Sequence, residues 1–281
     1  MFKRKTEGSV ICTSCGVLVG VNDATCYNCG RRNPGLWGFA PALRALGNDL
    51  GFVSFVTGGT VIMYVLSLVM SRQGVQVMLS PSSYALRILG ASGASPVFEF
   101  GWWWTVLTAA WLHGGIFHIF FNVMWIRQLG PEIAGLYGAG RMIFIYTIAG
   151  VVGFTLSSLA GLFLGNFPIY FLRGAGLTVG ASAPIFGLLG ALVHYGRRTG
   201  SSHVGAAGLQ YALILGVFGL IPGFSVDNYA HLGGFAGGYL ASLILDPLKP
   251  ERIDHILIAV GCLVATVAAV IYTVISALPY L

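Results

Sequence analysis

The chain has 281 residues, of which 56% are hydrophobic and only 9% are charged, with a formal net charge of +6. Soluble domains carry roughly a quarter charged residues, because polar groups must cover their surfaces. Composition therefore excludes an ordinary soluble domain and indicates a membrane protein. The basic residues stand almost entirely between apolar segments, so the net charge does not indicate a nucleic-acid partner.

The first 35 residues are polar and contain two CxxC pairs, Cys12 with Cys15 and Cys26 with Cys29, each followed by glycine. Two such pairs supply four thiolates for a tetrahedral metal ion, and glycine permits the tight turn that each pair needs. The spacing predicts a structural zinc ribbon, with redox chemistry or disulfides as the alternatives. A site closed by four cysteines leaves no position for a substrate, so we expect the zinc to take no part in catalysis.

Residues 36–51 are predicted to form an amphipathic linker at the membrane surface. Apolar stretches of roughly 17–25 residues follow, and each is long enough to cross a hydrocarbon core of about 30 Å. They predict an all-α polytopic membrane protein with seven transmembrane helices. The predicted spans lie near 52–71, 104–126, 142–164, 180–196, 205–221, 229–245 and 256–278.

The distribution of basic residues supports this count. With the N-terminus in the cytoplasm, twelve of the 15 basic residues fall in inner segments, and only Arg72, Arg87 and Arg173 fall in outer ones. This asymmetry is what the positive-inside rule expects, and it puts the C-terminus outside. The first outer loop, about 72–103, is long and ends in tryptophans that are typical of a membrane interface.

Three groups of polar residues stand out within the apolar stretches, where an unpaired polar side chain is costly. The first lies in the second stretch, where His118 and Asn122 share one helix face and His113 lies nearer the outer end. A polar pair that joins two helices is the alternative to a functional site. Metal binding by two histidines usually requires a third ligand nearby, and the sequence provides none.

The second group is GASAPIFGLLG, residues 180–190, which opens the fourth stretch. Ser182 precedes Pro184, and proline favours the first turn of a helix, so we expect Ser182 at a helix N-terminus. There, free backbone N–H groups stabilise a negative oxygen, as a serine nucleophile requires. A simple N-cap serine is the alternative. Gly187 helps to give this helix a flat face.

The third group is NYAHLGGFAGG, residues 228–238, with His231 near the start of the sixth stretch. Gly234 and Gly238 follow at GxxxG spacing, which permits close helix packing. Packing of the two flat faces would bring Ser182 and His231 within hydrogen-bonding distance. None of the nine acidic residues falls securely within a span, so the sequence predicts a Ser-His dyad without an acidic third member. A structural histidine is the alternative for His231.

The motifs HGGIFHIFFN, GASAPIFG and AHLGGFAGG occur in this order on the second, fourth and sixth predicted spans. Together they resemble the motifs of the rhomboid intramembrane serine proteases, over about residues 50–245. The resemblance implies that Ser182 is the nucleophile and His231 the base. It also implies that His118, Asn122 and the backbone N–H of Ser182 hold the oxyanion.

The resemblance gives roles to two further residues. His113 matches an additional histidine near the site, and Phe186 matches an aromatic residue that packs beside the catalytic histidine. The chain departs from the family pattern where Ala183 replaces glycine, Thr105 replaces arginine and Ala134 replaces glutamate. None of these departures removes a catalytic group, whereas inactive relatives typically lack the serine or the histidine.

The cysteine spacing and the residue pattern predict a zinc ribbon (1–35), a linker (36–51) and an additional seventh helix (247–281), and the resemblance implies a six-helix protease core (52–246). It implies an intramembrane serine endopeptidase without a catalytic cofactor, which cleaves single-pass membrane proteins near the outer face of the lipid bilayer. The ribbon would bind a cytoplasmic partner. An inactive rhomboid-like protein that binds transmembrane clients is the alternative, and a transporter would require charged residues within the membrane. The polar start without a presequence predicts a prokaryotic plasma membrane.

Overall fold

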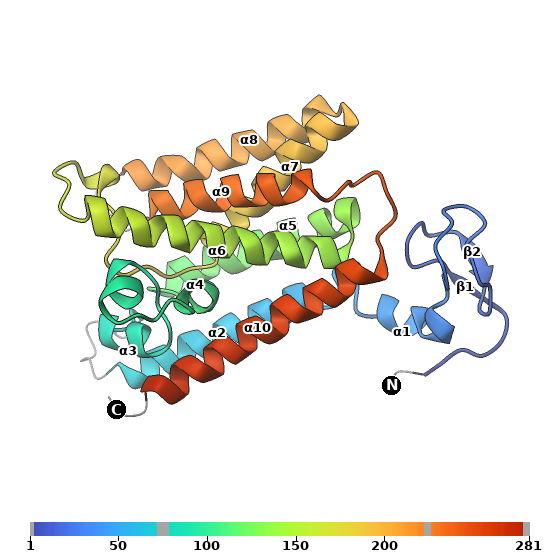
Figure 1. Cartoon of the computed structure of the whole chain (residues 1–281), viewed down its shortest axis with the longest axis horizontal. Helices are drawn as coiled ribbons and strands as arrows, with labels where there is room; N and C mark the ends of the chain where they lie inside the picture. Colours follow the sequence, from blue (N-terminus) through green and yellow to red (C-terminus); the bar gives the residue numbers. More distant parts are fainter. Residues whose placement is uncertain (1–2, 72–78, 222–225, 278–281) are drawn as a thin grey trace.

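The computed structural model describes residues 3–71, 79–221 and 226–277 of the chain. Its long helices run side by side in a bundle, and residues 3–35 form a small module beyond one end of it (Figure 1). The long helices are α2 (Phe52–Met70), α5 (Ile116–Tyr137), α6 (Ala139–Leu164), α7 (Ser182–Thr199), α8 (Ser202–Val217), α9 (Asn228–Leu243) and α10 (Ile253–Ala277). This is the all-α polytopic architecture that the sequence predicts.

Residues 3–35, called the cysteine module below, fold around one short hairpin. The strands β1 (Ser9–Ile11) and β2 (Leu18–Gly20) pair antiparallel and enclose a small core together with the cysteines. The linker that follows contains only a 3₁₀ turn, η1 (Leu36–Gly38), and the short helix α1 (Ala40–Arg44) before α2 begins. The module therefore has a core of its own, separate from that of the bundle.

Length and composition identify the helices that could cross a membrane. Among the described residues, α2, α6, α10 and the combination of α8 with the turn η6 (Phe218–Leu220) meet this test. A fifth span results if α5 is counted together with the bent segment before it. The helix α9 is short at 16 residues, and α7 ends in Arg197 and Arg198. The count of seven spans therefore stays a prediction.

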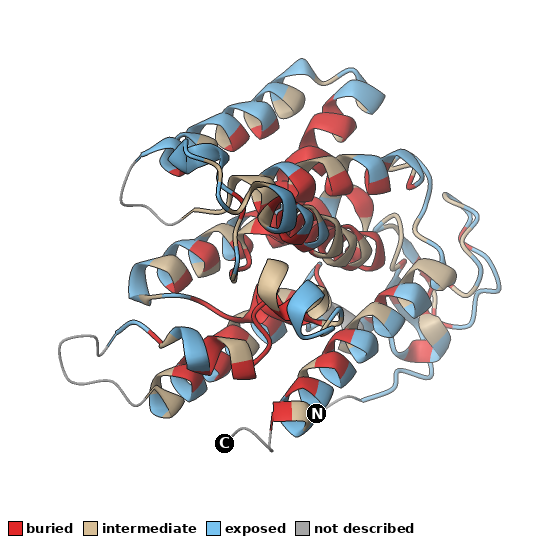
Figure 2. Ribbon diagram, turned by 60° about the vertical axis from the view of Figure 1, so that its left-hand side comes forward, coloured by how far each residue is buried: buried red, intermediate tan, exposed pale blue. Residues whose placement is uncertain are grey.

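The helix α7 lies at the centre of the bundle, packed against α6, α8 and α9. Every residue from 183 to 194 is buried, whereas α2, α8 and α10 expose many apolar side chains. Figure 2 shows buried residues concentrated in the middle of the bundle and exposed residues around it. A helix enclosed by protein does not need the continuous apolar surface that contact with lipid demands. This explains why α7 is less hydropathic than its neighbours although it is the most deeply buried.

The second predicted span differs from the observed helices, and the prediction of one helix over 104–126 is wrong. The short helix α4 (Thr105–Thr108) and the turn η4 (Ala109–Trp111) come first, and α5 begins only at Ile116, bent by 95° from them. Gly114 and Gly115 lie at the break, because glycine readily leaves the helical conformation. His113 therefore lies in the turn before α5 and not on a membrane-spanning helix.

Residues 79–111 include most of the predicted first outer loop and are called the outer segment below. They pack against α6 and α10. They contain α3 (Ser83–Ile88), a π-helical turn η3 (Ser95–Glu99), α4 and η4. The backbone of this segment pairs with the chain just before α7. Ser92 N–H donates to Thr178 O at 3.0 Å, and Thr178 N–H donates to Ser92 O at 2.8 Å. These two hydrogen bonds thus fix the stretch that leads into α7 to the outer segment.

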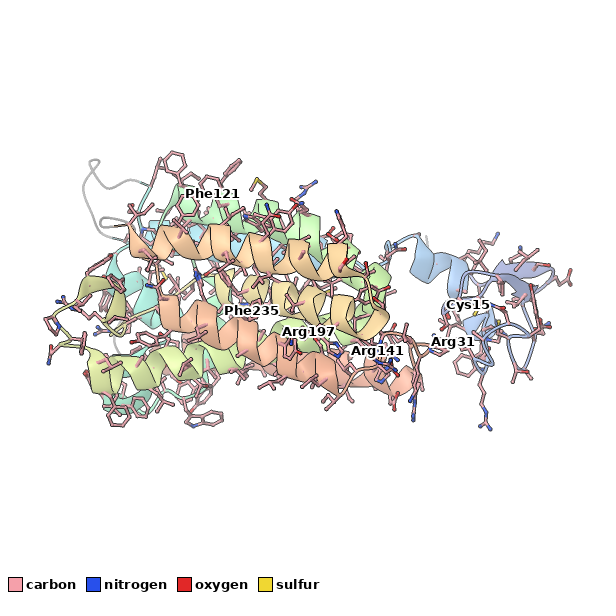
Figure 3. The ribbon with its side chains drawn as sticks, turned by 90° about the horizontal axis from the view of Figure 1, so that it is seen from above. Cys15, Arg31, Phe121, Arg141, Arg197 and Phe235 are labelled. Carbon is pink, nitrogen blue, oxygen red and sulfur yellow. The ribbon has the colours of Figure 1, made fainter. Side chains whose placement is uncertain are left out.

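At the opposite end of the bundle, the connection between α9 and α10 packs on the turn between α5 and α6. Arg141, near the start of α6, is buried there and donates hydrogen bonds of 2.8–3.2 Å to four backbone carbonyl oxygens. These oxygens belong to Tyr137, Asp246, Lys249 and Pro250. The cysteine module reaches the same place, where Arg31 Nη1 donates to Glu251 O at 3.1 Å (Figure 3).

Candidate active site and metal site

Ser182 is the first residue of α7, and the chain reaches it through a turn with an unusual backbone. Gly180 has a φ of +129°, which residues with a side chain rarely adopt. Its N–H donates to Ala109 O at 2.9 Å, so the turn is fixed to the outer segment. The first N–H groups of a helix have no partner within it. Ser182 therefore stands where backbone donors are available to a negative oxygen.

His118 and Asn122 face this turn from α5. A Cβ atom at Gly180 would lie 2.5 Å from His118 Nε2 and 3.7 Å from Asn122 Nδ2. The backbone N–H of Gly114 donates to His118 Nδ1 at 3.3 Å, which leaves the ring proton on Nε2. Asn122 Nδ2 donates to His118 O at 3.0 Å. Both side chains thus direct N–H donors toward the turn at Gly180, which precedes Ser182.

His231 lies on the first turn of α9 and stacks on Phe186 of α7. The ring centroids are 4.0 Å apart and the planes differ by 15°. Phe186 is one turn after Ser182, so the imidazole lies over the start of α7. His231 Nδ1 is buried without a hydrogen-bond partner, and within the described residues no hydrogen bond joins Ser182 to His231. Catalytic hydrogen bonds often form only when substrate is bound, so this geometry is compatible with a dyad.

Glycines set the distance between α7 and α9. A Cβ atom at Gly238 would lie 2.1 Å from Gly187 O, and one at Gly234 would lie 2.1 Å from Ala183 O. Only glycine permits two backbones to approach this closely. The three glycines that the sequence analysis selected for helix packing, Gly187, Gly234 and Gly238, all lie in this interface.

His113 is fully buried in the turn before α5. Its ring centroid lies 5.0 Å from that of His118, with the planes at 72°. Neither ring nitrogen has a hydrogen-bond partner in the part of the chain that the structure describes. His113 therefore contacts the site through the ring of His118.

The sequence analysis gave no role to two residues that position the site. Asp227 caps α9, because its Oδ1 accepts a hydrogen bond of 2.9 Å from Ala230 N and its Oδ2 accepts one from Ser157 Oγ of α6. Gly153 of α6 lies where α7 and α9 meet, since a Cβ atom there would be 2.9 Å from Ala183 Cβ. Aspartate before a helix is a recognised N-cap signal, so Asp227 could have been found, whereas no local pattern marks Gly153.

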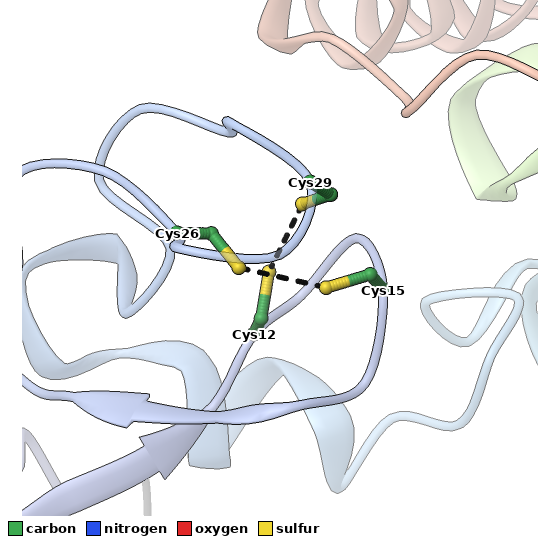
Figure 4. A group of neighbouring side chains, drawn as sticks. All are labelled: Cys12, Cys15, Cys26 and Cys29. Atoms are coloured by element: carbon green, nitrogen blue, oxygen red, sulfur yellow. Dashed lines mark hydrogen bonds between the residues drawn. The ribbon is translucent and has the colours of Figure 1, made fainter.

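The four cysteines of the module form a second candidate site (Figure 4). Cys12 Sγ lies 3.8 Å from Cys29 Sγ, and Cys15 Sγ lies 3.6 Å from Cys26 Sγ. All four sulfur atoms lie within 4.8 Å of one another. Zn–S bonds of about 2.3 Å in a tetrahedron separate the sulfur atoms by about 3.8 Å, so the arrangement fits a zinc ion. Burial raises the pKa of the Cys12 thiol above its ordinary value, and a bound cation would instead favour the thiolate.

Comparison with known proteins finds relatives for part of this chain. Residues 101–247, just over half of the chain, match the family model described as Rhomboid domain. RHOMBOID-like protein 7 of Arabidopsis thaliana is 34% identical over 173 residues, which are 60% of this chain and 51% of that protein. Rhomboid protease GluP of Bacillus subtilis (strain 168) is 31% identical over 196 residues, which are 69% of this chain and 36% of that protein. Inactive RHOMBOID-like protein 8 of Arabidopsis thaliana is 30% identical over 163 residues, which are 56% of this chain and 42% of that protein.

The chain thus spans about half the length of these relatives or less. The matched region runs from the outer segment to the end of α9, and it includes Ser182, His231 and the residues that surround them. The apolar helices outside it, α2 and α10, complete an integral membrane protein. The match, together with the helical bundle, shows that the chain belongs to the rhomboid family.

Proposed function

We propose that the chain is an intramembrane serine endopeptidase with Ser182 as nucleophile and His231 as base. The observation that carries the proposal is that residues of two helices, α5 and α9, pack around the start of α7. His231 stacks on Phe186 one turn after Ser182, and His118 Nε2 faces the turn at Gly180 that leads into Ser182. These two contacts support the proposal, because a candidate base lies against the residue one turn after Ser182 and a candidate oxyanion donor lies against the turn before it.

In the proposed reaction, His231 takes the proton of Ser182 Oγ while that oxygen attacks the carbonyl carbon of a peptide bond. The tetrahedral oxyanion accepts hydrogen bonds from His118 Nε2–H, the Asn122 side-chain amide and the backbone N–H of Ser182. The protonated histidine then gives its proton to the leaving amine. A water molecule, deprotonated by the same histidine, hydrolyses the acyl-enzyme and frees the serine.

We infer that the substrates are transmembrane segments of single-pass membrane proteins, cleaved near the outer face of the bilayer. Ser182 begins α7, and Arg197 and Arg198 end it, so the site lies at the end of the helix away from these basic residues. Basic residues favour the cytoplasmic side. The same rule puts the cysteine module in the cytoplasm, where we propose that it holds a structural zinc ion and meets a cytoplasmic partner.

A client-binding protein without protease activity is the second candidate. Two observations favour it: no hydrogen bond joins Ser182 to His231 within the described residues, and one relative carries the name Inactive RHOMBOID-like protein 8. Such a protein would bind transmembrane segments in the same bundle but would not form an acyl-enzyme.

Reaction with a fluorophosphonate probe distinguishes the two candidates without knowledge of the natural substrate. We expect the purified protein to be labelled and to cleave a single-span reporter, and we expect both activities to be lost in Ser182→Ala and His231→Ala. The matched controls are Ser54→Ala and His203→Ala, because both side chains are exposed and lie outside the site. A folded protein that neither reacts nor cleaves would favour client binding, and labelling that survives Ser182→Ala would refute the assignment of the nucleophile.

A further inference from the structure

The turn that joins the cysteine module to the linker exposes aromatic side chains that neither the proposed metal site nor the proposed protease uses. Trp37 is 66% exposed and Phe39 is 43% exposed. Residues 33–39 are called the aromatic turn below. Single exposed apolar residues are normal on a protein surface, so their exposure indicates a partner only together with further observations.

The backbone of the aromatic turn holds Trp37 in this exposed position at a conformational cost. Leu36 and Trp37 have φ angles of +48° and +54°, which bulky residues rarely adopt. Hydrogen bonds fix this conformation, because Trp37 N–H donates to Asn33 Oδ1 at 3.1 Å and Phe39 N–H donates to Leu36 O at 3.0 Å. Strained backbone of this kind gathers at functional positions. The exposure of Trp37 is thus built into the turn.

Three basic residues at the start of the described chain lie against the aromatic turn. Lys3, Arg4 and Lys5, called the basic segment below, are all exposed. Arg4 Nε donates to Trp37 O at 2.8 Å. Lys5 N–H donates to Gly38 O at 2.9 Å, and a Cβ atom at Gly38 would overlap Lys5 O. The cations and the exposed tryptophan are therefore held next to each other.

The charge of this surface favours an anionic partner. The basic residues of the module outnumber its two acidic residues, Glu7 and Asp23. Within the described residues, neither carboxylate forms an ion pair with the basic segment. Asp23 Oδ2 instead accepts a hydrogen bond of 2.7 Å from Gly20 N in its own turn. The positive charge of the basic segment therefore remains available to a partner.

Two connections hold the aromatic turn beside the membrane. The linker joins it to α2, which begins at Phe52. Arg31 of the module donates to Glu251 O, just before α10 begins at Ile253. Both α2 and α10 are long and apolar enough to cross a membrane, and Figure 1 shows α1 between the module and the end of the bundle. The surface closest to the turn, apart from the protein itself, is thus that of the bilayer.

We propose that the aromatic turn binds the inner leaflet of the bilayer, with Trp37 and Phe39 at the level of the headgroups and the basic segment against anionic lipid phosphates. Tryptophan is enriched at membrane interfaces because its ring is amphipathic, and basic residues beside a membrane are attracted to anionic lipids. A cytoplasmic protein is the other candidate, but the position next to two apolar helices favours lipid. The proposal takes only the cytoplasmic side of the module from the proposed function, and it stands or falls independently of Ser182.

The test uses the full-length protein, supplied with zinc, in nanodiscs of phosphatidylcholine with or without phosphatidylglycerol. Lipids brominated next to the headgroup quench the fluorescence of tryptophans that contact them. The emission of Trp37 is the difference between the wild type and Trp37→Phe, because the other tryptophans are common to both. We expect brominated lipid to quench most of this emission with phosphatidylglycerol present and less of it without. No quenching in either composition would overturn the proposal in favour of a protein partner, and equal quenching in both would overturn it by excluding the anionic lipid.

A tryptophan elsewhere on the module is the matched control. Leu18 is 62% exposed and lies on β2, which Figure 1 shows on the side of the module away from the bundle. In the double variant Trp37→Phe, Leu18→Trp, we expect brominated lipid to leave the added emission unquenched. Equal quenching at the two positions would show that the module has no preferred face toward the bilayer, and would refute the proposal.

A pair of charge variants separates the basic segment from the charge of the whole protein. Lys3→Gln removes one charge beside the aromatic turn, and Lys249→Gln removes one at the end of the bundle, where Lys249 is 77% exposed. We expect the ratio of quenched to unquenched Trp37 to fall about fivefold in Lys3→Gln, as for one charge at an anionic membrane, and less than about twofold in Lys249→Gln. Equal losses would reduce the effect to net charge and refute the proposal.

Zinc content and resistance of the module to trypsin show whether each variant is folded. If Trp37→Phe unfolds the module, the wild-type protein decides the question. A photoactivatable phosphatidylglycerol should then form adducts with residues 36–39, located by mass spectrometry. Adducts on the bundle but not on these residues would refute the proposal.

Discussion

Trp104 Nε1 donates a hydrogen bond of 2.9 Å to Thr273 Oγ1, and the Trp104 ring meets Tyr272 edge to face at 4.5 Å. The last helix is thereby tied to the outer segment. The outer segment in turn accepts a hydrogen bond from Gly180 at Ala109 O. The seventh long helix, α10, thus connects through two contacts to the turn that leads into Ser182.

This connection predicts the effect of Thr273→Val, which keeps the shape of the side chain and removes the acceptor of Trp104. We expect the free energy of unfolding to fall by about 1 kcal/mol, the usual contribution of one hydrogen bond, and fluorophosphonate labelling to slow. Thr266→Val is the matched control, because Thr266 and Thr273 each donate to the carbonyl four residues earlier but only Thr273 contacts Trp104. Equal effects of the two substitutions in thermal unfolding would contradict the connection.

The close approach of α7 and α9 predicts the effect of Gly238→Ala. The new Cβ atom would lie 2.1 Å from Gly187 O, so the helices must separate. We expect destabilisation of about 1–3 kcal/mol, as for other overpacked interiors, and loss of probe labelling. Gly261→Ala on α10 is the control, because nothing lies within 4 Å of its new Cβ atom, and alanine favours a helix over glycine. A Gly238→Ala protein as stable as Gly261→Ala would show that the two helices tolerate separation.

The backbone at Gly180 predicts a local effect on catalysis. In Gly180→Ala, the side chain would press on His118 Nε2 and the φ of +129° would be strained. We expect the rate of labelling to fall by about a hundredfold, the effect of losing one oxyanion donor in serine hydrolases. Gly176→Ala is the control, because a Cβ atom at Gly176 would have no other atom within 4 Å, and its rate of labelling should stay close to that of the wild type. Measured by probe kinetics, wild-type rates in Gly180→Ala would remove His118 from the proposed oxyanion site.

The arrangement of the four cysteines predicts that the purified protein contains one zinc ion per chain, which elemental analysis measures. Replacement of Cys15 by serine should remove the bound zinc, because three thiolates bind zinc less tightly than four. Cys262→Ser should retain the ion, since Cys262 lies on α10 and not in the module. A chelator should melt the module but leave labelling at Ser182 unchanged, because the module contacts the opposite end of the bundle. Zinc retained in Cys15→Ser would exclude a four-cysteine site.

The sequence predicts some elements closely, because their signals are local. The span predicted at 52–71 is the helix Phe52–Met70, and the helix start expected at Ser182 is where α7 begins. The break at Gly114 and Gly115 was missed, because a run of apolar residues looks the same whether or not the chain turns within it. Hydropathy measures how apolar a stretch is, so the predicted span ended at residue 126 and missed the more polar second half of α5, which continues to Tyr137.

Contacts between residues far apart in the chain could not be predicted from the sequence. Arg141 looks like a loop residue by charge, but its guanidinium is buried because four carbonyl groups from other turns surround it. The hydrogen bond expected between Ser182 and His231 is not present within the described residues, and it stays a prediction for the substrate-bound protein. The motifs predict which residues belong to the site, but the sequence does not predict how the helices pack around them.

The contact between Arg31 and Glu251 joins positions 220 residues apart in the chain, and this has a consequence for biosynthesis. The module leaves the ribosome before the helices and can fold while they are still being inserted. The surface that receives it does not exist until residue 251 has been made and the connection between α9 and α10 has returned to the same side. Docking of the module is thus one of the last steps of assembly, and a nascent chain that ends before Glu251 would carry the module undocked.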